Sequence, residues 1–255
     1  MTYPGAGDEA STSRRKPPRP APVINIVESD DDAGPADLTV AVIPTITYFP
    51  VGRQWQQMIC ELFGWQFVRQ SSPVTEPVQI DLTRRPKVRR VRGDGNCYYR
   101  AISYIVTGSE DQWRGIKDAV LHLMLINVDL IIQHEAENPG YLLDLGHQPR
   151  RDRRVLTPRD KVTRYLERHA GDNVWADTLI IHFTGFLLKT RVELFLERRE
   201  RRSDARWILN HADWSGIQRE FLTYDVELPH ATTEEALYVH HPDDHFDAAC
   251  EGLVE

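Results

Sequence analysis

Cys97 stands where a glycine-rich loop turns into an apolar stretch with helical spacing. In "RGDGNCYYRAIS", residues 92–103, two glycines bracket Asp94, and Asn96 leads into the cysteine. A cysteine in the first turn of a helix faces the positive end of the helix dipole and unpaired backbone N–H groups, which favour the thiolate. The sequence therefore predicts a lowered pKa for Cys97, and an oxyanion hole formed by the backbone N–H groups of Gly95, Asn96 and Cys97. The alternative interpretation is a small buried core residue.

A cysteine nucleophile needs a histidine that takes its proton, and that histidine needs an acid or amide to hold it. Among ten histidines, His245 is the best candidate, because it follows a turn at the start of a predicted strand and Asp247 lies two positions on. The strand period of two places both side chains on one face. His240 and His241 are the competing candidates, since a register slip in the hairpin would present a different ring.

These residues resemble the ovarian-tumour (OTU) family of cysteine proteases, most of which are deubiquitinases. The family signature Asp-Gly-Asn-Cys-x-Phe/Tyr-Arg-Ala is matched by "DGNCYYRA", with Tyr99 at the aromatic position. The segment "NVWADTLIIHFTGFLLKTRVELF" is similar to the family's tryptophan, central helix and short strand. The final "HFD" is similar to its closing block, with Phe246 in the usual tyrosine position. The resemblance covers roughly residues 88–250.

The resemblance implies a papain-like OTU fold and a thiol-dependent isopeptidase that cleaves ubiquitin or a ubiquitin-like modifier from lysine without a cofactor. Cys97 would be the nucleophile and His245 the general base and acid, with Asp94 or Asp247 as the third member. Ala176 departs from the family, which usually has glycine after the tryptophan. The alternatives are a catalytically silent ubiquitin- or SUMO-binding scaffold, and a protease of the same chemistry acting on a viral or mobile-element polyprotein.

The elements that must position these residues form an α+β arrangement, with helices packed on a small mixed sheet, helices first and strands last. Residues 71–92 look irregular, and residues 138–154 are the expected region of variable substrate contacts. Helical periodicity or capping signals predict helices near residues 55–63, 97–105, 109–124, 157–169 and 175–189. Strands are predicted for "RVELFL", "RWILN" and "FLTYDVEL", and for two strands joined by the turn "HPDD".

The composition limits which partners and which cellular compartment we expect for this chain. Acidic residues outnumber basic ones by 38 to 31, so the net charge of -7 gives no general field that attracts nucleic acid. The basic cluster "RRPKVRR" is either a nuclear-import or nucleic-acid patch or a solvated approach to the next loop. Three scattered cysteines favour a reducing compartment, cytosol or nucleus, and predict no metal site. The most apolar segment, "AVLHLMLINVDLII", is too short and too polar to cross a bilayer.

Residues 1–45 have the composition of a disordered tail, with many Pro, Ser, Asp and Gly. Within it, residues 23–32 resemble a SUMO-interacting motif, in which a β-branched run adds to a sheet edge and acidic residues flank it. Val23, Ile24 and Ile26 would fill the apolar groove of SUMO. A run that arose by chance, or that docks on the protein's own domain, is the alternative. The predicted boundaries are a tail at 1–45, a linker with a short helix at 46–87, and a catalytic domain at 88–252.

Overall fold

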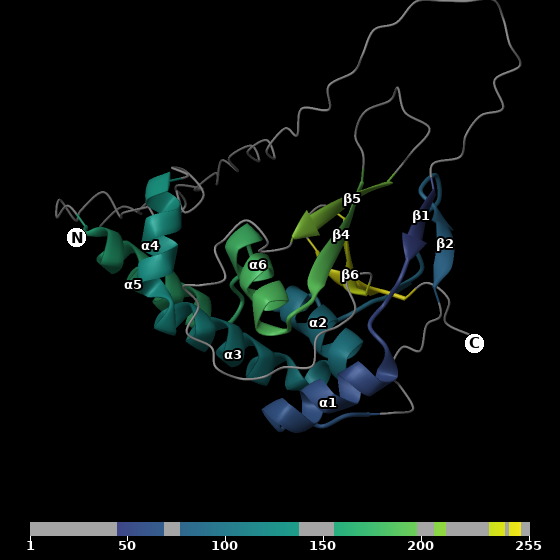
Figure 1. Ribbon diagram of the computed structural model, residues 1–255, viewed down its shortest axis with the longest axis horizontal. Coiled ribbons are helices and arrows are strands. Elements are labelled where there is room, and N and C mark those ends of the chain that lie inside the picture. The colour runs from purple at the N-terminus through teal and green to yellow at the C-terminus, as the bar shows by residue number, and fades with distance from the viewer. Residues whose placement is uncertain are drawn as a thin grey trace, which may run out of the picture. The chain divides into compact units, whose positions relative to one another are not determined.

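The computed structural model describes residues 45–68, 77–137, 156–197, 207–212, 235–242 and 245–250 (Figure 1). The predicted tail at 1–45 lies outside these residues except for Thr45, which begins a strand. The SUMO-interacting motif in that tail, the variable region at 138–154 and the strand "FLTYDVEL" all lie outside them. The domain boundaries and the function of the motif therefore stay predictions.

A five-stranded mixed sheet confirms the predicted α+β class. Its strand order is β3-β7-β6-β4-β5, with β4 and β6 parallel and the other neighbours antiparallel. The strands span Val88–Arg89 (β3), Arg191–Glu197 (β4), Trp207–Ala212 (β5), Ala236–His241 (β6) and Asp247–Ala249 (β7).

Two parts of the sequence prediction for the strands are wrong. Residues 71–92 are not irregular throughout, because β2 (Val78–Asp81) and β3 lie in that stretch. β2 pairs with β1 (Thr45–Tyr48) in a separate two-stranded antiparallel sheet, so strands do not simply follow the helices along the chain. Both strands in the 71–92 stretch are four residues or fewer, too short to give a periodic signal.

The helices agree with the predicted pattern in most places. Ser109, however, caps only a short 3-10 helix, η1, and does not form a capping box for the longer helix behind it. The central helix begins only at Thr178, with Asp177 as its cap, so Trp175 stays outside it and is 46% exposed. The helices are α1 (Arg53–Phe63), α2 (Cys97–Thr107), η1 (Glu110–Gln112), α3 (Trp113–Ile126), α4 (Val128–Glu137), α5 (Pro158–Ala170) and α6 (Thr178–Leu187).

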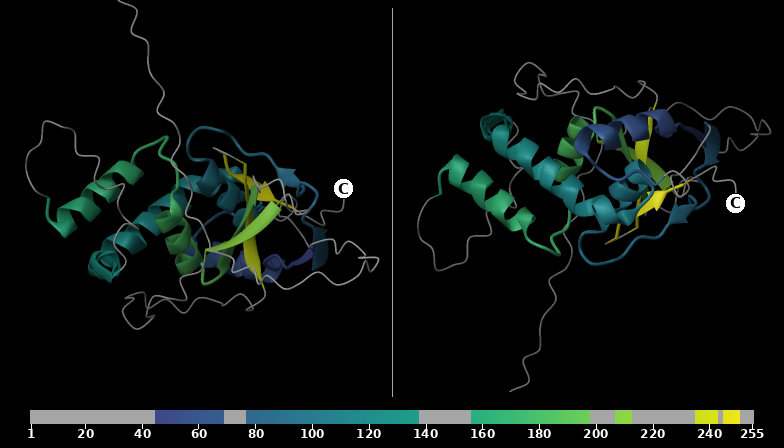
Figure 2. Two further views of the ribbon diagram at one scale, coloured as in Figure 1. Left: turned by 90° about the horizontal axis from the view of Figure 1, so that it is seen from above. Right: turned by 90° about the horizontal axis from the view of Figure 1, so that it is seen from below.

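Helix α2 lies at the centre of the described fold. It packs against α1 and α3 and against strands β6 and β7. Ten of its eleven residues are buried, which explains why its sequence is apolar almost all round. Helices α4 and α5 lie at the end of α3 that is far from the sheet (Figures 1 and 2). The surrounding elements therefore fix the N-terminus of α2 in place.

At one edge of the sheet, the segment before α2 pairs with β7 and Cys250. Val88 pairs with Ala249 across β3 and β7, and the N–H of Cys250 donates to the carbonyl of Lys87 at 2.9 Å. Strand β7 is held on its other side by β6, with Val239 opposite Ala248. This pairing brings residues 88–97 beside residues 245–250.

Among the described residues, no helix is long and apolar enough to span a membrane.

Candidate active site

Cys97 is the first residue of α2, as the sequence predicts. Asn96 is its N-cap position, and Gly95 before it has a φ of 76°, a left-handed conformation that suits glycine. The loop can therefore turn sharply into the helix. Cys97 is only 3% exposed and belongs to the hydrophobic core.

His245 and Asp247 form a hydrogen-bonded pair. Nε2 of His245 lies 3.0 Å from Oδ1 of Asp247, which also accepts from the backbone N–H of Val91 at 3.1 Å. Asp247 is the first residue of β7, whereas His245 precedes the strand in the turn, its N–H donating to the carbonyl of Pro242. Because a carboxylate accepts, His245 carries its proton on Nε2 and leaves Nδ1 as an acceptor.

The hydrogen-bonded pair of His245 and Asp247 lies next to the loop that leads into Cys97. A Cβ atom built on Gly93 would lie 3.6 Å from Nδ1 of His245, so the ring edge that carries Nδ1 packs against that loop. The backbone N–H of Phe246 interacts with the Cys97 thiol, and the Phe246 ring meets Tyr98 edge-on at 5.2 Å between centroids. The structure thus gathers the predicted cysteine, histidine and aspartate at one place.

The predicted lowering of the Cys97 pKa is wrong for this structure. Burial raises the pKa of the thiol above its ordinary value, and the N–H groups of Phe246, Tyr98 and Cys97 only partly offset that effect. The helix-start argument accounts for these stabilising N–H groups, but the degree of burial follows from the tertiary packing. A raised pKa means that the thiol is protonated near neutral pH and needs a base to ionise it.

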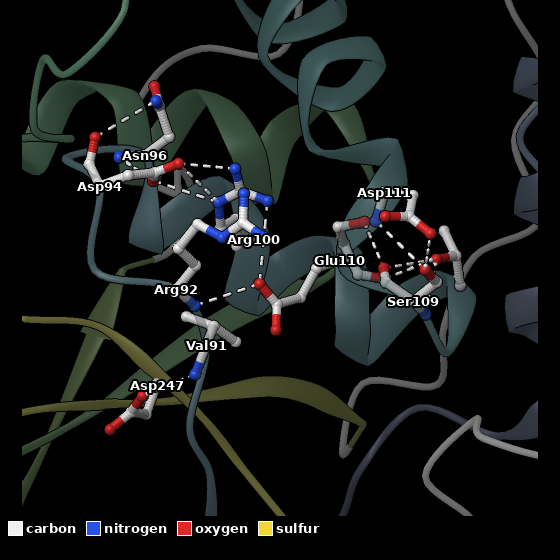
Figure 3. Close-up of polar contacts among 11 residues, drawn as sticks. Val91, Arg92, Asp94, Asn96, Arg100, Ser109, Glu110, Asp111 and Asp247 are labelled. Carbon is white, nitrogen blue, oxygen red and sulfur yellow. Dashed lines mark hydrogen bonds and ion pairs between the residues drawn. The ribbon is translucent and has the colours of Figure 1, made fainter.

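Asp94 is bound to a different partner from the histidine. Its two carboxylate oxygens share the single Nε–H of Arg100, each at 3.1 Å, and Oδ2 also accepts from Nη2 at 2.6 Å (Figure 3). This guanidinium holds the pKa of Asp94 below its usual range. Figure 3 shows Asp247, the first residue of β7, beside Val91 and away from Arg100. Of the two aspartates that the sequence left open, Asp247 is the one that contacts His245.

One of the three predicted oxyanion donors is already in use. The N–H of Asn96 donates to Oδ1 of Asp94 at 3.1 Å and so closes the turn within the loop. An oxyanion could receive this N–H only if that bond broke. The N–H groups of Gly95 and Cys97 are the other two candidate donors, and that of Cys97 also interacts with its own thiol.

The two competing histidines have other surroundings. His240 is fully buried in β6, and its Nδ1 lies 3.9 Å from Oδ2 of Asp247. His241 packs its ring on Phe246, with centroids 4.1 Å apart. Burial alone would raise the pKa of Asp247, but His240, the N–H of Val91 and His245 together hold it below its usual value. Asp247 is therefore a carboxylate at neutral pH.

Sequence reasoning missed several residues that support the loop. Arg100 is buried under Trp113, with its guanidinium carbon 4.9 Å from the ring centroid, and it faces Glu110 at 3.8 Å. Glu110 in turn accepts from the N–H of Arg92 (Figure 3). Lys117 on α3 donates to the side chain of Asn96. Arg100 and Lys117 both lie at buried positions of their helices. Helical periodicity in the sequence could have indicated these positions, but not the partners of the two side chains.

The contact between Gly95 and the turn before α6 gives a stability prediction. A Cβ on Gly95 would lie 2.6 Å from the Cα of Asn173, so Gly95→Ala adds a backbone clash to the strain of a positive φ. We expect it to lower the free energy of unfolding by about 2–4 kcal/mol. Gly64 is the matched control, since its φ is 67° and nothing lies within 4 Å, so Gly64→Ala should cost about 1 kcal/mol. Equal losses in urea denaturation would contradict the contact.

The remaining chemistry is limited. Cys60 and Cys250 are buried and form no disulfide, and burial raises the pKa of Cys60 to about 12. Cys97 is the thiol that interacts with the N–H of Phe246, the residue next to His245. In the part of the chain that the structure describes, no group of three or more His, Cys, Asp or Glu side chains could hold a metal ion.

Comparison with known proteins gives loose structural likenesses. The sequence matches no family model and no curated protein. The structure is similar to the viral OTU domain protease from Farallon virus, with 20% identity over 64% of this chain and 82% of that chain and a TM-score of 0.42. The OTU domain of OTUD1 is 18% identical over 63% of this chain and 83% of that chain, with a TM-score of 0.42. An OTU deubiquitinase from Wolbachia pipientis wMel bound to ubiquitin is 14% identical over 64% of this chain and 93% of that chain, with a TM-score of 0.37. TM-scores below 0.5 establish neither family nor activity for this chain.

Proposed function

We propose that this chain is an OTU-like cysteine isopeptidase that hydrolyses the bond between the C-terminal glycine of ubiquitin, or of a ubiquitin-like modifier, and a lysine. The observation that carries the chemistry is the His245–Asp247 pair at 3.0 Å, set against the loop that presents Cys97. The substrate class is supported by the resemblance of "DGNCYYRA" and "HFD" to the OTU signature.

In the proposed mechanism, Nδ1 of His245 takes the thiol proton while Sγ of Cys97 attacks the isopeptide carbonyl carbon. The N–H groups of Gly95 and Cys97 stabilise the oxyanion of the tetrahedral intermediate. When the intermediate collapses, the C–N bond breaks and the imidazolium gives its proton to the leaving lysine amine. Water, deprotonated by His245, then attacks the thioester carbon and the C–S bond breaks. The modifier leaves with a free C-terminal carboxylate, and the imidazolium returns its proton to the Cys97 thiolate. Asp247 keeps the Nε2 proton in place throughout.

The raised pKa of Cys97 supports one feature of this mechanism. Because the resting thiol is neutral near pH 7, a base must remove its proton before or during the attack. The base must therefore already be oriented, and the bond from His245 to Asp247 supplies that orientation. Asp247 itself is fixed by the N–H of Val91 and by its place at the start of β7.

Ubiquitin with a C-terminal thiol-reactive electrophile tests the proposal directly. We expect the wild-type chain to form a covalent adduct, seen as a gel shift of about one ubiquitin mass, because the electrophile places its carbon where the isopeptide carbonyl would lie. Cys97→Ala should form none. Cys60→Ala, the same change at another buried thiol, is the matched control and should react like wild type.

The outcomes separate the alternatives. An adduct on Cys97→Ala would overturn the assignment of the nucleophile. A wild-type chain that folds and reacts with a SUMO electrophile but not with ubiquitin would keep the chemistry and change the modifier. A folded chain that binds ubiquitin yet reacts with no electrophile would favour the silent scaffold.

A further inference from the structure

A buried lysine lies behind the cysteine loop. Lys117 on α3 is 3% exposed, and its Nζ donates to Oδ1 of Asn96 at 3.2 Å and to the carbonyl of Gly171 at 2.5 Å. The same ammonium lies 5.5 Å from the ring centroid of Tyr99. A buried ammonium is costly unless it is hydrogen-bonded, so these contacts are the reason that it can stay there. The mechanism above makes no use of this residue.

The two acceptors of Lys117 belong to segments that also touch each other directly. Asn96 is the residue immediately before Cys97, whereas Gly171 begins the turn that leads towards α6. In that turn, Asn173 has a φ of 63° and its backbone packs against Gly95 so closely that no Cβ would fit. Lys117 thus joins the cysteine loop to the turn at residues 171–173.

Acidic groups surround this lysine. Burial lowers the pKa of Lys117, while the nearby carboxylates of Asp172, Asp118 and Asp94 act in the opposite direction, and Arg114 adds to the lowering. None of these carboxylates replaces the two oxygen acceptors, which are an amide and a backbone carbonyl. The contact is therefore directional as well as electrostatic.

We propose that Lys117 is a positioning residue for the proposed hydrolysis: by holding the Asn96 side chain against the Gly171 carbonyl, it fixes the loop that carries Cys97 and the oxyanion donors. The inference rests on the proposed function for its effect on turnover, but not for its effect on the loop. If the ammonium is removed, the Asn96 and Gly171 oxygens lose a buried donor. The loop then gains freedom beside the reacting atoms.

The first arm of the test needs no substrate. Lys117→Met keeps a flexible, unbranched side chain, one atom shorter than lysine, and removes the donor. We expect amide hydrogen exchange in peptides covering residues 93–99 and 170–174 to become at least tenfold faster than in wild type, with exchange in β6 unchanged. Unchanged exchange in both peptides of a folded variant would overturn the proposal, whatever the activity of the chain.

The second arm measures catalysis with a fluorogenic amide at the ubiquitin C-terminus. We expect Lys117→Met to lower kcat about tenfold or more and to change KM less than threefold, since the loop contacts the reacting atoms and not the body of ubiquitin. Asn96→Ala should lower kcat in the same way by a smaller factor, because it removes the Lys117–Asn96 bond and keeps the bond to Gly171. The double variant should be no worse than Lys117→Met, since both changes remove the same Lys117–Asn96 bond. Additive losses would overturn the proposal.

Val120→Ala is the matched control for lost stability, since Val120 is fully buried on the same helix and has no polar side-chain atom that could bond to either segment. It should lower thermal stability while leaving kcat within about twofold of wild type. A fall in kcat equal to that of Lys117→Met would show a general packing effect and overturn the positioning role. If the wild-type chain cleaves no ubiquitin substrate, the proposed function fails, and the exchange arm still decides the role of Lys117.

Discussion

Cys97→Ala is expected to lower hydrolysis of a ubiquitin C-terminal amide by about 10⁴-fold or more, because no other group in the site can form the covalent intermediate. Ubiquitin binding should persist, since the change removes one sulfur atom from a residue that is only 3% exposed. The structural cost should be about 1 kcal/mol, the scale of one small buried group. Steady-state kinetics and titration of the variant with labelled ubiquitin measure both quantities.

The same substitution at Cys60 shows whether the loss is chemical. Cys60 is fully buried on α1, and its thiol contacts the carbonyl of Val106 at 3.6 Å, away from the histidine pair. Cys60→Ala should therefore cost similar stability and leave kcat within about twofold. Residual turnover above a hundredth of the wild-type rate in Cys97→Ala would contradict the assignment of Cys97 as nucleophile.

Local signals in the sequence predicted most of the helices around the site. The start of α5 follows from Thr157 and Pro158, and the structure adds a capping box in which Thr157 and Asp160 bond to each other's backbone N–H. The end of α2 follows from Gly108, which adopts a left-handed φ of 79°. Such signals act within one turn of chain, so they can be read without knowing the fold.

The missing parts depend on contacts between distant segments. Strand β3 has two residues and exists because β7 offers it a partner, so no periodicity could reveal it. The choice between Asp94 and Asp247 likewise depends on which carboxylate the fold brings to His245. Lys117 was visible in principle, because it lies at a buried position of α3, four residues after Trp113. Its partner could not be read from the pattern.

His245→Ala is expected to lower kcat/KM at pH 7 by about 10³-fold, because it removes the general base and acid while leaving the nucleophile.

Asp247→Asn should lower kcat/KM less, by about tenfold to 10²-fold. The asparagine can still offer an oxygen to the N–H of Val91 but cannot stabilise the imidazolium charge. Asp94→Asn should leave the histidine untouched and act only through the loop that Arg100 holds.

The pH dependence separates loss of a base from loss of structure. Burial raises the pKa of Cys97, so without His245 the thiolate forms only as the pH rises towards and past that raised value. The activity of His245→Ala on a substrate with a good leaving group should therefore keep increasing above pH 9, narrowing its deficit relative to wild type. Asp247→Asn retains a base and should follow the wild-type profile more closely. A deficit for His245→Ala that stays constant from pH 6 to pH 10, in a chain that remains folded, would show that His245 does not take the thiol proton.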